Sequence, residues 1–397
     1  MHRDTMSTEL MEKHVPRHRK PLAGGAPKAP SRNAGGAPKA PSRLAEGPPK
    51  APSRLAGPPK LLAGLLLAAL GLAVLTGCGG PAADSSASAG GDGSGGSIAL
   101  VAYSTPKEAY AELIPAFNKT SQGKGVKFTQ SYGASGDQSR AVQSGLPADF
   151  VALSLAPDVD KLVEPGLVDK NWADTPTHGF VTDSVVVFAV RKGNPKNIHG
   201  WEDIVKPGVQ VITPNPFTSG GAKWNLMAAY GSQIAQGKSP AEGLDFLKNL
   251  LKNTPVQDKS ARESLSTFSG GKGDVLISYE NEAITAQKAG VELDYVIPDQ
   301  TILIQNPAAV TTGAKSPDKA KAFLDFLTTP EAQKIYAAKG YRSVLPELVD
   351  KSKYPTPKDL FKIDKFGGWD KVNTDFFDPD NGSVAKIEQD LGVSTAK

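Results

Sequence analysis

Apolar and polar positions change their spacing repeatedly along residues 98–340, and each change marks the boundary of an expected element. Short β-branched runs predict strands at residues 98–103, 126–131, 150–155, 209–213 and 274–279, with β-like segments at 301–304 and 308–311. Apolar positions three and four apart predict helices at residues 106–121, 137–144, 222–236 and 241–252, with others after 157 and from 281. Residues 184–190 are almost continuously apolar, which is typical of a strand buried on both faces.

Two later helices carry start signals, Ser316-Pro317 and Thr329-Pro330, and the second is expected to end near Gly340. Strands that alternate with helices predict an α/β fold with mostly parallel sheets. A body of about 300 residues is large for one sheet and one core. We therefore expect two α/β lobes with a ligand cleft between them.

An uncharged apolar run at residues 61–75 follows Lys60 and leads into Leu75-Thr76-Gly77-Cys78. This order resembles a bacterial lipobox, and it predicts a signal region at 61–77 and a lipid on Cys78, the single cysteine of the chain. The alternative is a core cysteine after a stray apolar run. Residues 78–97 are rich in Gly, Ser and Ala, and a flexible linker of this length spans roughly 25 Å.

The formal net charge of +4 is unevenly placed. Residues 1–60 hold 12 Lys and Arg against 4 Asp and Glu, which leaves 33 against 37 in the rest of the chain. The motif GGAPKAPSR begins at Gly24 and again at Gly35, and such Pro/Gly-rich text predicts a disordered basic leader. It is either a tail that contacts nucleic acid or lipid headgroups, or an over-long leader from an upstream start codon. The acidic remainder gives no reason to expect a nucleic-acid partner.

Candidate catalytic and metal-ligating residues are few. Three of the five histidines lie in the leader, and His178 and His199 each stand alone, without a second ligand at metal-binding spacing. The chain also lacks G-x-S-x-G and G-x-x-x-x-G-K-[ST]. We therefore expect no metal, no cofactor and no catalytic residue, and the chain is not expected to be an enzyme.

A turn of small residues recurs before expected helices, at residues 133–136, 218–222 and 259–263. Helix starts present unpaired N–H groups and a partial positive charge, so several of them converging could bind an oxyanion without a countercharge. The alternative is ordinary helix capping at each turn. The residues alone leave open whether the three turns meet.

These turns belong to a series of motifs that resembles the periplasmic sulfate-binding proteins of ABC-type sulfate/thiosulfate importers. The resemblance runs from about Val101 to Trp369. Its motifs are YGASG at 132–136, VDKNW at 168–172, VRKGNPK at 190–196, VITPNP at 211–216, SGGAKWN at 219–225, GDVLI at 273–277, ENEA at 280–283 and FGGW at 366–369.

The resemblance implies a two-lobed solute-binding fold, similar to the type II class, that closes over a dehydrated sulfate. Residues 98–185 and 305–385 are expected to form the first lobe, residues 186–304 the second, and residues 386–397 a tail. Two hinge strands are expected to cross between the lobes, near Ser184–Val190 and Thr301–Val310.

By the same resemblance, the sulfate ligands are main-chain amides with one hydroxyl and one aromatic donor. The hydroxyl is assigned to Ser135, and the amides to Ser104, Ser219, Gly220, Gly221 and Ala261. Tyr279 occupies the position of the family's indole, and its phenol can accept as well as donate a hydrogen bond. Sites made of donors select sulfate over phosphate, because phosphate keeps a proton that such a site cannot accept.

The function implied is that of an extracytoplasmic, lipid-anchored monomer that delivers sulfate to a membrane ABC permease and its ATPase. Thiosulfate is the alternative ligand within the class, and molybdate or tungstate is less favoured. A secreted α/β enzyme acting on an oxyanion substrate and a sensor or adhesion module are alternatives from other classes.

Overall fold

The computed structural model describes residues 95–395. The basic leader (1–60), the signal region (61–77) and Cys78 with most of its linker lie outside the described residues, so these predictions are not addressed by the fold. In the part of the chain that is described, every helix is too short or too polar to span a membrane.

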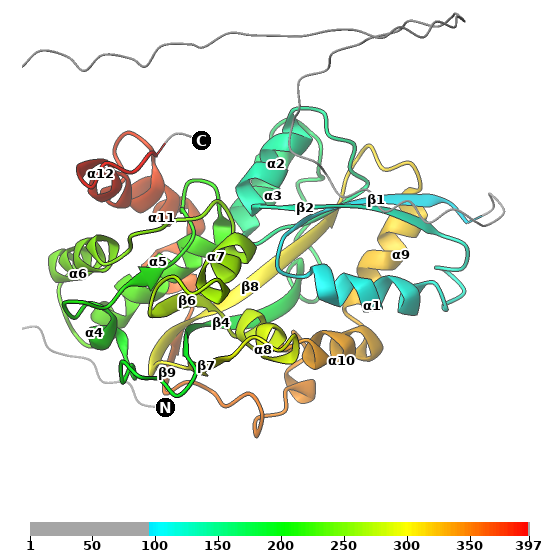
Figure 1. The fold of residues 1–397 in the computed structure, drawn as a ribbon. Coiled ribbons are helices and arrows are strands. Elements are labelled where there is room, and N and C mark those ends of the chain that lie inside the picture. The colour runs from blue at the N-terminus through cyan, green and yellow to red at the C-terminus, as the bar shows by residue number, and fades with distance from the viewer. Residues whose placement is uncertain (1–94, 396–397) are drawn as a thin grey trace, which may run out of the picture. The chain divides into compact units, whose positions relative to one another are not determined.

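Strands and helices alternate along the described chain, as the sequence pattern predicts (Figure 1). The strands are β1 (Ser97–Tyr103), β2 (Lys127–Gly133), β3 (Phe150–Ala152), β4 (Phe180–Arg191), β5 (Val211–Ile212), β6 (Val275–Tyr279), β7 (Leu293–Val296), β8 (Gln300–Val310) and β9 (Asp359–Phe361).

The helices are α1 (Lys107–Phe117), α2 (Ser135–Gln143), α3 (Ala156–Val163), α4 (Trp201–Ile204), α5 (Gly220–Ala235), α6 (Pro240–Lys252), α7 (Ala261–Ser269), α8 (Glu280–Lys288), α9 (Pro317–Leu327), α10 (Pro330–Ala338), α11 (Gly368–Phe377) and α12 (Ser383–Asp390). Two 3₁₀ turns, Pro346–Leu348 and Ile363–Phe366, lie between α10 and α11.

The strands join in the order β2-β1-β3-β8-β4-β6-β5, with β7 added to β4 and β9 to β8. The β1 pairings with β2 and β3 and the β5–β6 pairing are parallel, whereas β4 and β8 run antiparallel to each other. The first half is defined here as β1–β3 with α1–α3, α9 and α10. The second half is β5–β7 with α4–α8, α11 and α12.

Strands β4 and β8 connect the two halves. Residues 180–185 of β4 pair with β8, whereas its residues 186–190 pair with β6 of the second half. Strand β8 begins beside β9, continues beside β4 and ends beside β3 of the first half. Two long strands therefore cross where hinge strands are predicted, and the segments 301–304 and 308–311 belong to one strand.

Each half has apolar layers on both faces of its sheet. In β4, Val186, Phe188 and Val190 pack into one cluster, while Val185, Val187 and Ala189 pack into another. The continuous apolar run at 184–190 is thus buried on both faces, as predicted. In the first half, α1, α9 and α10 cover one face of β1 and β3, and α2 and α3 cover the other.

The C-terminal segment differs from the predicted lobe assignment. Strand β9 pairs with the start of β8, and Val372, Phe377 and Val384 of α11 and α12 are buried in the core of the second half. Residues 359–385 therefore pack with the second half rather than with the first. The predicted tail also begins inside α12, where Ile387 and Glu388 are buried, because this helix turns an apolar face toward α6 and α11. The remaining lobe boundaries stay a prediction.

Candidate functional site

Three helix starts carry most of the residues assigned to the anion. Ser135 is the first residue of α2, Ser219 precedes α5, and Ala261 is the first residue of α7. Ordinary capping accounts for α7, where Ser260 accepts a hydrogen bond from the Glu263 amide at 3.3 Å. Ser219 does not cap α5 with its side chain, so ordinary capping does not account for its hydroxyl.

The starts of α2 and α5 are in direct contact. The amide of Gly136 donates to the carbonyl of Thr218 at 3.2 Å, and a Cβ atom at position 136 would lie 3.0 Å from that oxygen. Glycine is therefore needed at Gly136 for the two turns to approach so closely. The structure brings the first two of the three small-residue turns together.

Gly221 lies at the centre of the assembled residues. A Cβ atom at this position would lie 3.3 Å from Ser219 Oγ, 3.6 Å from Tyr279 Oη and 3.7 Å from Ala261 Cβ. The starts of α5, α7 and α8 therefore face one small volume, with Tyr279 preceding α8. The structure therefore brings Ser219, Gly220, Gly221, Ala261 and Tyr279 together.

Ser104 follows β1 and joins the group through its neighbour. Arg262, next to Ala261, donates from Nη2 to the carbonyl oxygen of Thr105 at 3.3 Å. The turn after β1 and the start of α7 are therefore adjacent.

The hydroxyl of Ser135 is engaged within the protein. Its Oγ accepts from the amide of Ser154 at 2.9 Å and donates to Oδ2 of Asp158 at 2.7 Å. A hydroxyl has one hydrogen to donate, so Ser135 could donate to an anion only by leaving Asp158. The Ser219 amide, which the resemblance assigns to the anion, instead donates to the carbonyl of Asn215 at 2.9 Å. The Ser219 hydroxyl beside Gly221 is better placed as the hydroxyl donor.

Ser154 is the polar residue that sequence reasoning missed. It follows β3, is only 1% exposed, and its Oγ lies 2.7 Å from Tyr279 Oη. Its carbonyl accepts from Trp224 Nε1 and from Asn306 Nδ2, both at 3.0 Å. A single buried serine after an apolar strand was the available signal, since ligands of α/β proteins bind beyond the carboxyl ends of strands.

Burial controls the ionisation of the phenol in this group. Tyr279 is 1% exposed, and burial raises its pKa well above the ordinary value, with the nearby Tyr103 acting in the same direction. The phenol is therefore protonated at neutral pH. It carries a hydrogen that can be donated to a ligand or to Ser154.

Arg262 links the two halves beside the site. Its guanidinium bonds Glu108 of α1 at 2.5 and 2.8 Å and Glu282 of α8 at 3.0 Å. Burial works against the charged guanidinium, but Glu108 and Glu282 together raise the pKa of Arg262 above its ordinary value. This arginine, which the sequence did not single out, connects α1 in the first half to α7 and α8 in the second.

A narrow crevice of about 10 Å³ lies beside the starts of α2 and α5. Its wall includes Asp158, Ser219 and Gly220, and three basic residues line it as well: Arg140, Lys161 and Lys223. Lys161 pairs with Asp158 at 2.9 Å, and Lys223 bonds Asn373 of α11 at 2.6 Å. Arg140 pairs with Asp137, so two of the three basic side chains beside the helix starts are matched by carboxylates.

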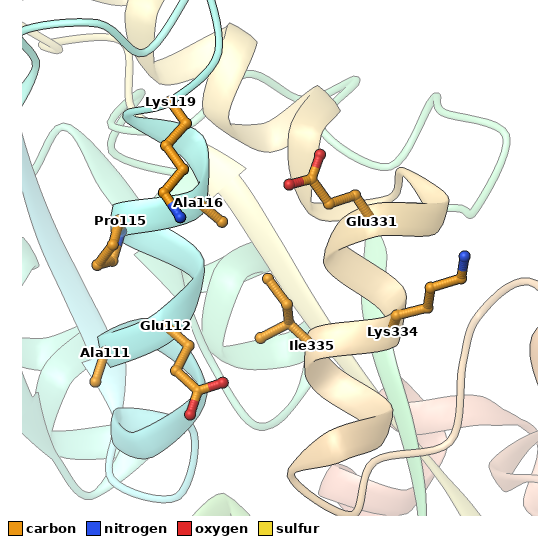
Figure 2. A pocket seen from close by; sticks show the side chains of 8 residues that line it. All are labelled: Ala111, Glu112, Pro115, Ala116, Lys119, Glu331, Lys334 and Ile335. Carbon is orange, nitrogen blue, oxygen red and sulfur yellow. The ribbon is translucent and has the colours of Figure 1, made fainter.

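A wider groove of about 650 Å³ lies between α1 and α10, on the first half (Figure 2). Ala116 and Ile335 face it, and Glu112, Lys119, Glu331 and Lys334 line its sides. None of the residues assigned to the anion belongs to this groove. Among residues 95–395, no group of three or more His, Cys, Asp or Glu side chains could hold a metal ion.

Comparison with known proteins identifies the family to which this chain is similar. A family model described as bacterial extracellular solute-binding protein matches residues 98–342. A sulfate-binding protein of Synechococcus elongatus is 41% identical over 83% of this chain and 96% of its own. A thiosulfate-binding protein of Pseudomonas aeruginosa is 36% identical over 70% of this chain and 88% of its own.

The solved structure of the sulfate-binding protein SubI from Mycobacterium tuberculosis is similar in both sequence and fold. It is 45% identical, with a TM-score of 0.70, and the match covers 71% of this chain and 99% of SubI. The two-lobed α/β fold of periplasmic binding proteins expected from the sequence is thus confirmed. The chain belongs to the bacterial extracellular solute-binding proteins and, within them, to the family of sulfate-binding proteins that serve ABC importers.

Proposed function

We propose that this protein captures sulfate outside the cytoplasm and delivers it to a membrane ABC permease driven by its ATPase. One observation carries the proposal: the starts of α5, α7 and α8 meet at Gly221, and the start of α2 contacts that of α5. Amides at helix starts can stabilise a dianion without a formal countercharge. Curated relatives named as sulfate-binding proteins support the same ligand.

The proposed ligands are the amides of Ser104, Ser135, Gly220, Gly221 and Ala261, with hydroxyl groups from Ser219 and Tyr279. Sulfate is fully deprotonated at neutral pH and needs only donors, which amides supply. Hydrogen phosphate would bring a proton to amides that cannot accept it, and an unmet buried hydrogen bond costs about 1–3 kcal/mol. Sulfate is therefore favoured over phosphate by the amide part of the site.

Closure of the two halves over the anion is the proposed mechanism, with β4 and β8 as hinge strands and the closed form recognised by the permease. We further propose that Cys78 carries a lipid that anchors a monomer to the membrane, with residues 79–97 as its linker. In this role the protein binds and releases sulfate without chemical change, so it is not an enzyme.

Titration calorimetry of residues 79–397 with sulfate, thiosulfate and molybdate tests the proposal. We expect sulfate to bind most tightly and thiosulfate to compete with it, since the relatives named for thiosulfate are less similar than those named for sulfate. No heat and no rise in melting temperature with sulfate or thiosulfate would refute the proposed function. Radiolabelled glycerol or fatty acid on the full-length chain, absent from Cys78→Ser, tests the anchor.

A further inference from the structure

Two hydroxyl groups lie side by side between the helix starts that form the anion site. Ser154 Oγ and Tyr279 Oη are 2.7 Å apart, and both residues are 1% exposed. A Cβ atom at Gly220 would lie 3.1 Å from Ser154 Oγ, and one at Gly221 would lie 3.6 Å from Tyr279 Oη. The pair therefore borders the first two amides of α5.

The backbone amide and carbonyl of Ser154 are already hydrogen-bonded to other residues. Its amide donates to Ser135, and its carbonyl accepts from Trp224 and Asn306. These three bonds fix the backbone of Ser154 but leave its Oγ free to rotate its hydrogen. The hydrogen of either hydroxyl can thus bridge the 2.7 Å contact.

The two arrangements of the pair have opposite effects on a ligand. Each hydroxyl has one hydrogen and two acceptor positions. When Ser154 donates to Tyr279, the phenol hydrogen can point to a deprotonated ligand oxygen. When Tyr279 donates to Ser154, the phenol oxygen can accept a proton from the ligand, and the Ser154 hydrogen can serve a second ligand oxygen. The amides of α2, α5 and α7 can only donate.

We propose that the Ser154–Tyr279 pair determines the oxyanion specificity of this protein and admits a singly protonated tetrahedral dianion, hydrogen phosphate, alongside sulfate. The inference rests on the function proposed above and concerns the same site. Sulfate remains the preferred ligand because every amide favours a fully deprotonated anion. Hydrogen phosphate is tolerated because its single proton can meet the phenol oxygen of this pair, whereas the amides around it can only donate.

Competition calorimetry on the full-length protein tests this pair, with sulfate and inorganic phosphate at a mildly alkaline pH where phosphate is mostly the singly protonated dianion. Tyr279→Trp replaces the phenol by a donor-only indole, and Ser154→Ala removes the acceptor of the phenol hydrogen. We expect the unaltered protein to bind both anions, and each variant to keep sulfate affinity within about tenfold. The sulfate-to-phosphate affinity ratio should rise by about 5- to 150-fold, the effect of one unmet buried hydrogen bond.

Tyr336→Phe is the matched control, because it removes a buried phenol oxygen from the core of the first half and should leave the ratio unchanged. Thermal unfolding confirms that each variant is folded, and either variant alone suffices for the test. Sulfate binding without measurable phosphate binding by the unaltered protein would overturn the inference, as would an unchanged ratio in the folded variants. If the unaltered protein does not bind sulfate at all, the result refutes the proposed function instead.

Discussion

Gly220 and Gly221 differ in the space available for a side chain. This difference decides which glycine can be substituted to test anion binding. A Cβ atom at Gly220 would lie 2.9 Å from Leu155 Cγ and 3.0 Å from Ser154 Cβ, so any side chain there displaces its neighbours. The nearest atom to a Cβ at Gly221 is 3.3 Å away. Substitutions at Gly221 therefore report on the ligand more than on packing.

Gly221→Asp should abolish sulfate binding, because it places a carboxylate beside Ser219, Ala261 and Tyr279, where the anion is proposed to lie. Gly221→Asn is the matched control, since it has nearly the same size without the charge. We expect calorimetry to show no binding for the Asp variant and weakened but measurable binding for the Asn variant. Equal affinities in the two variants would mean that the anion lies elsewhere.

At the scale of single residues, the sequence predicted the residues of the anion site that lie in recognisable turns. It missed the polar residues that lie outside such turns. Ser219, Gly221 and Ala261 follow or begin turns of small residues, which the pattern reveals. Ser154 and Asn306 are polar residues in otherwise apolar strand regions, and only the pairing of β3 with β8 brings them together. The internal use of the Ser135 hydroxyl depends on Asp158, 23 positions away, and no local signal reports it.

Helix α8 is anchored at its first residue by a buried ion pair. Arg342, which follows α10, bonds Glu280 at 2.7 and 3.1 Å, and the two side chains are 7% and 0% exposed. Glu280 directly follows Tyr279, so this pair fixes the end of α8 that contributes to the anion site. Burial raises the pKa of Glu280 despite the opposing effect of Arg342.

Arg342→Met should lower the free energy of unfolding by about 3 kcal/mol, because it leaves the Glu280 carboxyl buried without its partner. Adding Glu280→Gln should restore part of that loss. Urea unfolding followed by circular dichroism measures both values.

Lys358→Met provides the control for removing one cation, since its pair with Asp299 is largely exposed and should contribute at most about 1 kcal/mol. Equal losses for Arg342→Met and Lys358→Met would show that burial of the Arg342–Glu280 pair is unimportant.

Most elements of the fold could be predicted from their patterns, and the exceptions have physical reasons. The spacing of apolar residues located β1, α1 and α6, a continuous apolar run located β4, and a Ser-Pro start signal located α9. The segments at 301–304 and 308–311 looked separate because polar Gln305 and Asn306 interrupt the apolar run, yet Asn306 is buried by its bonds to Thr182 and Ser154. Helices α11 and α12 were not predicted, although each carries an apolar face, which packs into the core of the second half.

The two halves of the whole molecule are connected by charge as well as by β4 and β8. Arg262 holds Glu108 from the first half and Glu282 from the second, and Lys259 pairs with Asp137 of α2 at 3.0 Å. These contacts are made across the proposed site. They should therefore contribute to the stability of the closed form and to the residence time of the ligand.

Glu108→Gln should speed sulfate release and weaken affinity by about tenfold, because it removes the charge that joins α1 to Arg262 while leaving the Arg262–Glu282 pair intact. Stopped-flow displacement measures the release rate. Glu112→Gln is the matched control, since it lies on the same helix and pairs with Lys339, at the end of α10 in the same half. Equal release rates for the two variants would argue against Arg262 as a link that stabilises closure.

The free energy of unfolding should depend on pH through the carboxyl of Asp183, which lies on strand β4. Burial raises the pKa of Asp183 to about 7, against the opposing effects of Gln305, Lys362 and Arg342. Because the folded pKa lies above the unfolded value, the unfolded chain loses this proton first as pH rises. The free energy of unfolding should thus fall by about 4 kcal/mol between roughly pH 4 and pH 7 on account of this group.

Asp183→Asn should remove that part of the pH dependence, as measured by urea unfolding without ligand at several pH values. Glu388 has a pKa raised to about 7, chiefly by burial, so Glu388→Gln should remove a second and separate part. Unchanged pH profiles in both variants would show that these carboxyls titrate normally in the folded protein.

The crossing of β8 also determines the order in which the chain can fold. Strand β3 pairs with β1 on one side and with β8 on the other, and Phe150 faces Val310, which is 160 positions later in the sequence. The sheet of the first half therefore cannot be completed until more than three quarters of the polypeptide has been synthesised. Pairings this distant make folding slow and leave strand edges exposed for longer. The first half therefore stays without its complete sheet until late in synthesis, and a segment in that state can still pass through a membrane pore, as the precursor of an extracytoplasmic protein must.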